Sequence, residues 1–257
     1  MNAFYSLTAK CRGRWHDLPG SGDPLIFIHG LGCASSFEYP RIVTDPSFAG
    51  RRAILLDLPG CGYSEKPQAY GYTITEQASV VAELVRHLGV ERCYLYGHSM
   101  GGSVAIEAAT QLGDVLAGLV VSEPNFHPGG GFFSKQICRH SEAAFVNTIY
   151  PRLVAQEQSA WAGSLAVDAP WAIWRGAASL IEGNEWFSLF TALAIPTRLI
   201  FGEQSLPDED FSCLEAMGVP VAVLPDCGHS MSWENPSALA QTLATFCDEL
   251  ALTPALR

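Results

Sequence analysis

Short, largely apolar segments alternate along this chain with longer segments in which apolar residues recur at helical spacing. The short segments are 25–29 (LIFIH), 53–56 (AILL), 93–96 (CYLY), 116–121 (LAGLVV), 197–201 (TRLIF) and 221–224 (VAVL). Continuous hydrophobicity of this kind is typical of strands that are covered on both faces. We therefore expect an α/β protein with a mostly parallel sheet and helices on both sides. An antiparallel hairpin around residues 4–16 brings the expected sheet to eight strands.

The segments between these strands carry helix signals at their ends. Residues 75–88 have apolar positions at helical spacing, and Gly89 follows as a plausible C-cap. Residues 100–112 are rich in alanine and other small residues. Residues 236–250 follow Asn235, which is a good N-cap, and begin with Pro236 at the first helical position. Each of these segments is predicted to be a helix packed on the sheet.

The stretch from residue 125 to residue 191 breaks this alternation. It opens with a Pro-Gly-Gly-Gly run and contains no clear strand. It also contains four of the six tryptophans, which are Trp161, Trp171, Trp174 and Trp186. We predict a mainly helical cap over 125–191, inserted into a core formed by residues 1–124 and 192–257. Most of these indoles are expected to pack inside the cap or core, and together they suggest an apolar pocket roof.

Composition and charge exclude several classes of protein. Of the 257 residues, 48% are hydrophobic and 16% are charged, which does not fit a disordered chain. The net charge of −11, without a cluster of Lys and Arg, argues against nucleic-acid binding. We see no apolar run of about 18 residues that would cross a membrane, and no signal-peptide pattern at the N-terminus. A cytoplasmic protein that acts on a small molecule is the expectation.

The eight cysteines do not suggest a metal site or a disulfide framework. They are spread over the chain, and no two of them form a C-x-x-C pair. We expect free, mostly buried thiols in a reducing compartment. No cofactor or metal ion is expected.

Residues 97–101 (GHSMG) form a G-x-S-x-G motif between a predicted strand and a predicted helix. This is the setting of a nucleophile elbow, in which a sharp turn aims a serine hydroxyl out of the sheet. The turn is strained and crowded, so glycine is needed at 97 and 101. Ser99 is the predicted nucleophile.

Two further loops supply the other groups that acyl transfer needs. Residues 29–32 (HGLG) follow the first buried strand, and we assign the backbone amides of Leu31 and Met100 as donors to the oxyanion. His29 itself is expected to organise its loop. After the last strand comes His229 beside Gly228, placed to take the proton of Ser99 as general base.

The order and spacing of these motifs resemble the α/β-hydrolase superfamily. The matching segments are HGLG (29–32), DLPGCGYS (57–64), GHSMGG (97–102) and GHS (228–230). More narrowly, the chain is similar to small lidded esterases, C–C hydrolases and cofactor-free haloperoxidase-like members. This resemblance implies the α/β-hydrolase fold with a helical cap after the sixth strand of the sheet. It also implies that Asp57 is a structural residue of its loop.

One position departs from this family pattern. In most of these relatives the triad acid follows the seventh strand in G-x-x-D, and this chain has Ser205 where that aspartate stands. A neutral serine cannot offset the charge of an imidazolium ion. Glu123, at the end of the sixth strand, is the expected acid, because that strand lies beside the nucleophile strand in this fold. Asp208 and Asp210 are the alternatives, Glu203 is a weaker one, and a Ser–His dyad is the last.

The sequence thus predicts a serine hydrolase that cleaves a small neutral or apolar carboxylic ester through an acyl-enzyme. A hydrolase of C–C bonds in diketone-type substrates would use the same residues. Epoxide hydrolysis and dehalogenation of the usual kind need a carboxylate nucleophile where Ser99 stands. An alternative of another class is a non-catalytic member that binds or senses a small ligand.

Overall fold

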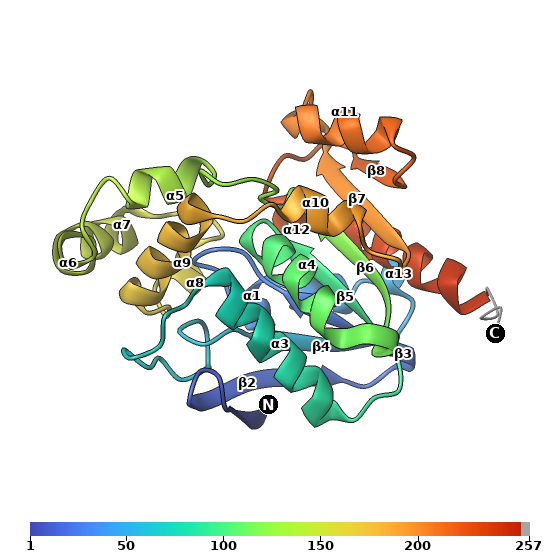
Figure 1. Ribbon diagram of the computed structural model, residues 1–257, viewed down its shortest axis with the longest axis horizontal. Helices are drawn as coiled ribbons and strands as arrows, with labels where there is room; N and C mark the ends of the chain where they lie inside the picture. Colours follow the sequence, from blue (N-terminus) through green and yellow to red (C-terminus); the bar gives the residue numbers. More distant parts are fainter. Residues whose placement is uncertain (253–257) are drawn as a thin grey trace.

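An eight-stranded sheet runs through the computed structural model, which describes residues 1–252 (Figure 1). In spatial order its strands are β1 (Asn2–Ser6), β2 (Cys11–Leu18), β4 (Arg51–Asp57), β3 (Ser21–Ile28), β5 (Cys93–His98), β6 (Leu116–Ser122), β7 (Thr197–Gly202) and β8 (Val221–Leu224). Strands β1 and β2 form an antiparallel hairpin, and β2 is antiparallel to β4. The remaining neighbours are parallel, so the predicted hairpin and mostly parallel sheet are confirmed.

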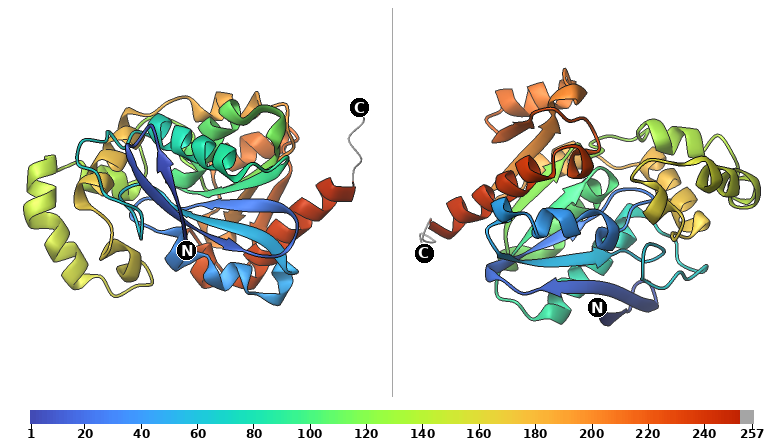
Figure 2. Two further views of the ribbon diagram at one scale, coloured as in Figure 1. Left: turned by 90° about the horizontal axis from the view of Figure 1, so that it is seen from below. Right: turned by 180° about the vertical axis from the view of Figure 1, so that it is seen from behind.

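Helices cover both faces of the sheet. On one face lie α3 (Ile74–Leu88) and α4 (Met100–Leu112), and on the other lie α1 (Ser35–Glu38), α2 (Pro40–Val43) and α13 (Pro236–Leu252) (Figure 2). The remaining elements of the core are η1 (Pro46–Phe48), η2 (Gly113–Val115), η4 (Glu203–Ser205), α11 (Glu209–Ala216) and α12 (Met231–Glu234).

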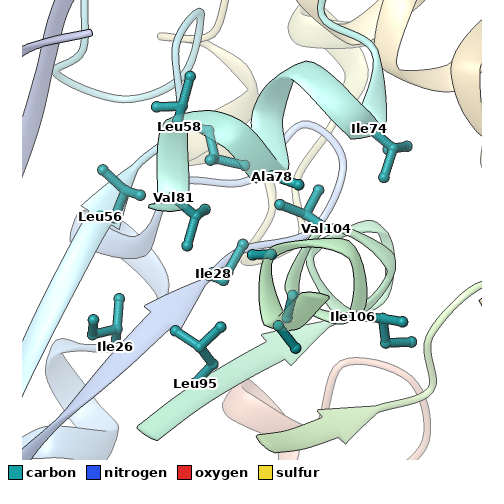
Figure 3. Packing of buried hydrophobic residues seen from close by; sticks show 14 of the residues in the cluster. Ile26, Ile28, Leu56, Leu58, Ile74, Ala78, Val81, Leu95, Val104 and Ile106 are labelled. Carbon is teal, nitrogen blue, oxygen red and sulfur yellow. The ribbon is translucent and has the colours of Figure 1, made fainter. Parts of the chain in front are cut away.

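The hydrophobic residues of one strand divide between two cores. Ile26 and Ile28 of β3 point to the α3 and α4 side, where they pack with Val81 and Val104 (Figure 3). Phe27, between them, belongs to the core on the α13 side. A strand that is buried on both faces needs apolar residues at consecutive positions, which explains the continuous hydrophobicity of the sequence.

The ends of α3 show how local sequence sets an element. Thr73 is its N-cap: the Thr73 hydroxyl accepts a hydrogen bond from the Glu76 amide (3.2 Å), and the Thr73 amide donates to the Glu76 carboxylate (3.0 Å). Gly89 ends the helix with a φ of 60°, a left-handed conformation that glycine adopts without strain. The helix therefore begins one residue before the predicted segment and ends where expected.

Between β6 and β7 the regular elements are all helices, joined by loops. They are α5 (Phe132–Ile137), α6 (Glu142–Ala144), the π-helical turn η3 (Phe145–Ile149), α7 (Tyr150–Gln156), α8 (Ala162–Leu165), α9 (Pro170–Glu182) and α10 (Trp186–Thr191). Helices α5 to α9 lie beside the ends of the strands (Figure 1). They have a small core of their own, which includes Phe145, Leu165 and Ile173. Helix α10 instead packs on α4, where the Trp186 indole donates to the buried Glu107 carboxylate (2.7 Å).

Asp168 connects the cap to the loop after β4. The Gly62 amide donates to its Oδ1 (2.8 Å), and the neighbouring Ala169 amide donates to the Gly60 carbonyl (2.8 Å). Its Oδ2 is buried and has no hydrogen-bond partner among residues 1–252. Burial raises the pKa of Asp168 to about 8. The carboxyl group is therefore protonated in the folded protein at neutral pH.

This protonation makes stability depend on pH. Because unfolding lowers the pKa of Asp168 from about 8 to its ordinary value of 3.8, the folded protein holds one proton more between these values. The contribution of this group to stability is therefore full below pH 3.8 and is lost as pH rises to about 8. Asp168→Asn keeps the acceptor for Gly62 and cannot ionise. We expect its melting temperature to exceed that of the wild type by a margin that grows, by about a few degrees, from pH 5 to pH 9.

The exposed Asp114 provides the control for this measurement. The margin for Asp168→Asn is measured against that for Asp114→Asn, which makes the same substitution at an exposed position. A margin for Asp168→Asn that shrinks as pH rises would show that the Asp168 carboxylate is stabilised rather than penalised by its surroundings.

Candidate active site

Ser99 occupies a strained turn between β5 and α4. Its φ of 53° and ψ of −125° are unusual for a residue with a side chain. A Cβ atom added at Gly97 would lie 2.2 Å from the Gly101 carbonyl oxygen, and one added at Gly101 would lie 2.3 Å from the Ile28 carbonyl oxygen. Both glycines of the motif are therefore required by close backbone approach. The turn leaves Ser99 partly exposed at the carboxyl edge of the sheet.

His229 lies in the loop between β8 and α12. The Gly228 amide donates to the Glu234 carboxylate (2.8 Å), and the Gln204 amide donates to the Cys227 carbonyl (2.9 Å). The first bond holds the loop to α12, and the second holds it to the segment after β7. The side chain of His229 is 49% exposed, so its imidazole is open to solvent and to an incoming substrate.

The carboxylate of Glu123 contacts the imidazole of His229. The His229 Nδ1 donates to Glu123 Oε2 over 2.6 Å, and the Gly202 amide donates to Glu123 Oε1 over 3.0 Å. Because an ionised carboxylate only accepts hydrogen bonds, the proton of a neutral His229 sits on Nδ1 and its Nε2 carries a free lone pair. The structure thus brings together the predicted base and the predicted acid.

Hydrogen bonds keep Glu123 ionised although its side chain is only 8% exposed. Burial raises its pKa, but the bonds from His229, the Gly202 amide and the Ser205 side chain outweigh burial, so the pKa of Glu123 lies below its usual value. Ser205 stands where the family pattern expects the acid. Its side chain therefore helps to lower the pKa of Glu123, the carboxylate that takes the place of that acid. Glu123 also has a positive φ of 39°, a conformation rare for a non-glycine residue.

The alternative acids make other contacts. Asp208 caps α11 by accepting a hydrogen bond from the Phe211 amide (2.8 Å). Asp210 accepts a hydrogen bond from His127 (2.9 Å), which raises the pKa of that imidazole. The sequence left the choice between these two residues and Glu123 open, and among the three the structure places Glu123 on His229.

The HGLG loop lies against Ser99, the predicted nucleophile. A Cβ atom added at Gly30 would be 3.4 Å from the Ser99 Cβ atom. His29 is fully buried: its Nε2 accepts from the Leu58 amide (3.0 Å), so its Nδ1 donates to the Gly30 carbonyl (2.9 Å). Burial lowers the pKa of His29, which keeps the ring neutral. His29 thus organises its loop, as expected.

Two backbone amides, one in this loop and one at the start of α4, are the predicted oxyanion donors. Leu31 follows Gly30 in a turn closed by a hydrogen bond from the Cys33 amide to the Gly30 carbonyl (3.2 Å). Met100 is the first residue of α4, where an amide has no acceptor within the helix. The amides of Leu31 and Met100 as oxyanion donors remain a prediction.

His98 is a site residue that the sequence reasoning did not single out. It is buried, its Nδ1 is hydrogen-bonded to the Ser122 hydroxyl (2.8 Å), and its ring centroid lies 4.7 Å from that of His229. Burial and the nearby His229 lower the pKa of His98 to about 3. A neutral His98 does not repel a protonated His229. Its place directly before Ser99 was the only signal in the sequence.

Residues 1–252 contain no group of three His, Cys, Asp or Glu side chains that could hold a metal ion. No helix within that range is both long and apolar enough to cross a membrane.

Comparison with known proteins identifies the family of this chain. A family model described as the alpha/beta hydrolase family matches residues 25–242. The chain is also similar to haloalkane dehalogenase 2 of Mycobacterium tuberculosis, with 34% identity over 130 residues, which make up 50% of this chain and 44% of that protein. The matched segment thus spans less than half of that relative.

Solved structures show the same fold over the whole length. A thermophilic esterase from Thermogutta terrifontis superposes with a TM-score of 0.79 at 22% identity, covering 97% of this chain and 98% of the esterase. An epoxide hydrolase superposes with a TM-score of 0.74 at 24% identity, covering 97% and 99%. At these identities the likeness establishes the fold, so the reaction has to be argued from the residues of the site.

Proposed function

The chain belongs to the alpha/beta hydrolase family, and from this premise we propose that it is a serine hydrolase of small neutral or apolar carboxylic esters. The observation that carries the proposal is the 2.6 Å hydrogen bond between His229 and Glu123, together with a serine held in an elbow directly after His98, whose ring centroid lies 4.7 Å from that of His229. A buried carboxylate on Nδ1 fixes the tautomer that a general base needs and stabilises the imidazolium that forms.

The reaction follows the acyl-enzyme route. The Ser99 Oγ attacks the ester carbonyl carbon, and its proton moves to His229 Nε2. The negative charge on the carbonyl oxygen is held by the Leu31 and Met100 amides. The C–O bond to the alcohol then breaks as Nε2 returns its proton to the leaving oxygen. Water, deprotonated by His229, hydrolyses the acyl ester on Ser99 and regenerates the hydroxyl group.

A serine nucleophile separates this chain from the reactions named for two of its relatives. Attack of a serine hydroxyl on the carbon of a haloalkane or an epoxide would form an ether, which water does not cleave under enzymatic conditions. Attack on an acyl carbon forms an ester, which the same base can hydrolyse. Ser99 therefore supports acyl transfer rather than dehalogenation or epoxide opening.

Aromatic side chains near the site support an apolar substrate. Phe37 stacks on Tyr63 with ring centroids 5.7 Å apart, and Phe133 packs on Trp161 at 5.2 Å. Tyr63 and Phe133 are each 53% exposed. Such rings offer contact area to an acyl chain or an aromatic alcohol. The net charge of −11 and the buried Glu123 disfavour an anionic acyl group.

A panel of p-nitrophenyl esters tests this proposal. We expect turnover of the acetate, butyrate and hexanoate esters, and a kcat/KM for the hydrogen succinate ester that is lower than for butyrate by about tenfold or more. The two acyl groups are similar in length, so their ratio isolates the effect of charge. Preferred cleavage of a diketone over every ester would favour the C–C hydrolase. Absence of both turnover and fluorophosphonate labelling would favour a ligand-binding protein.

A further inference from the structure

One side chain of the cap is bonded to the turn beside the nucleophile. The Trp161 indole N–H donates to the carbonyl of Gly32 over 2.7 Å, although the two residues are 129 positions apart in the sequence. Gly32 directly follows Leu31, whose amide is one of the two assigned oxyanion donors. Two of the other tryptophans in residues 125–191 make different contacts: Trp174 donates within the cap to the His140 carbonyl (2.8 Å), and Trp186 donates to Glu107.

The contact is close as well as directional. A Cβ atom added at Gly32 would lie 2.8 Å from the Trp161 ring, which leaves no room for a side chain. Gly32 also has a φ of 67°, a conformation that residues with a side chain rarely adopt. Phe133 of α5 also packs on the indole, with ring centroids 5.2 Å apart. The indole is thus held between the cap and the turn.

The hydrogen bond from Trp161 helps to fix the orientation of the peptide between Gly32 and Cys33. The peptide that joins Gly32 to Cys33 has its carbonyl bonded to Trp161 and its N–H bonded to the Gly30 carbonyl (3.2 Å). Because a peptide unit is planar and rigid, fixing both groups fixes its orientation. This plane closes the turn that carries Leu31, so the direction of the Leu31 amide depends on it.

A second cap residue lies against the side chains of Leu31 and Met100, the two residues whose amides are assigned to the oxyanion. At Gly176 of α9, an added Cβ atom would lie 3.2 Å from the Leu31 Cδ1 atom and 3.4 Å from the Met100 sulfur. The cap therefore packs on the side chains of the same two residues whose amides are assigned to the oxyanion. Its position and the geometry of those amides are mechanically linked.

We propose that Trp161 is a positioning residue that couples the seating of the cap to the oxyanion-binding turn. This inference rests on the proposed serine hydrolase function. The turn is held in its catalytic geometry only while the cap is in place, so an unseated cap lowers the rate of acyl transfer. Oxyanion donors act on the charge that develops in the transition state, so loss of their alignment lowers kcat and leaves KM nearly unchanged.

Trp161→Phe tests the proposal, because it keeps an aromatic ring and removes the N–H donor. With p-nitrophenyl butyrate we expect kcat to fall by about tenfold or more, a part of the effect of losing a whole donor. The affinity for a trifluoromethyl ketone, whose serine adduct carries an oxyanion, should fall by a similar factor. Trp161→His, which restores a ring N–H, should recover part of both losses.

Trp174→Phe is the matched control, because its N–H donates over a similar distance to an acceptor inside the cap. It should keep the kcat of the wild type. Equal kcat values for Trp161→Phe and Trp174→Phe, or no recovery in Trp161→His, would overturn the coupling. If Trp161→Phe does not fold, Phe133→Ala loosens the packing of the indole instead. An unchanged kcat in that variant would then overturn the proposal.

The failure of this inference is distinguishable from failure of the proposed function. If the wild type and Trp174→Phe hydrolyse the ester and only the predicted loss in Trp161→Phe is missing, the coupling is wrong and the hydrolase stands. If the wild type itself neither hydrolyses esters nor reacts with a fluorophosphonate, both are wrong.

Discussion

Replacing Ser99 with alanine is expected to lower kcat/KM for p-nitrophenyl butyrate by about 10³-fold or more. The variant has no group that can form the acyl-enzyme, so only binding and oxyanion stabilisation remain. The fold should be unchanged, because the Ser99 contacts that hold the turn come from its backbone: its amide donates to the Ser122 carbonyl (2.9 Å), and its carbonyl accepts from the Gly102 amide (2.8 Å). Steady-state kinetics and a melting curve check both statements.

Ser230 offers a control for this substitution. It is an exposed serine directly after His229, so Ser230→Ala changes the same region without touching the elbow. This variant should keep most of the wild-type activity. Residual activity in Ser99→Ala above about a tenth of the wild type would contradict the nucleophile assignment.

Replacing Glu123 with glutamine should lower kcat by a factor of about 10³ to 10⁴. The Gly202 amide needs an acceptor, so the oxygen of the introduced carboxamide would turn toward it and the NH₂ group would face His229. His229 Nδ1 would then have to accept a hydrogen bond, which moves the ring proton to Nε2. In that tautomer the imidazole cannot take the proton of Ser99, and the charge that balances the imidazolium is also lost.

Asp208→Asn and Asp210→Asn are the controls for the acid. Asp208 caps α11 and Asp210 binds His127, so each substitution should cost far less activity than Glu123→Gln. A loss for Asp210→Asn as large as that for Glu123→Gln would show that the acid comes from the loop after β7. Activity of Glu123→Gln within about tenfold of the wild type would indicate a Ser–His dyad.

The parts of the site that sequence could predict are those specified by a motif or by the strand order of the fold. The strand–elbow–helix unit around Ser99 is specified by glycines at 97 and 101: a Cβ atom at Gly97 would meet the Gly101 carbonyl oxygen within the turn, and one at Gly101 would meet the Ile28 carbonyl oxygen of the neighbouring strand β3. Glu123 could be placed because the strand order of the fold puts β6 beside β5, where Ser122 pairs with His98. Because residue 205 is a serine, few other carboxylates near the predicted site could serve as the triad acid.

Contacts between distant segments could not be predicted in this way. Trp161 and Gly32 meet only because of how the cap folds, and four tryptophans in one segment gave no reason to select this one. Trp186 lies within the predicted cap range, yet its bond to Glu107 holds it on the core. The environment of His98 depends on the hydroxyl of Ser122 in the next strand, which pattern alone does not reveal.

The central claim is that Ser99 is an activated nucleophile. Labelling the intact protein with a fluorophosphonate and locating the adduct by peptide mass spectrometry tests it most directly. We expect one adduct per chain, on the peptide that contains Ser99, with labelling abolished in Ser99→Ala and strongly slowed in Glu123→Gln. A folded wild-type protein that does not react, or that carries the adduct on another residue, would contradict it.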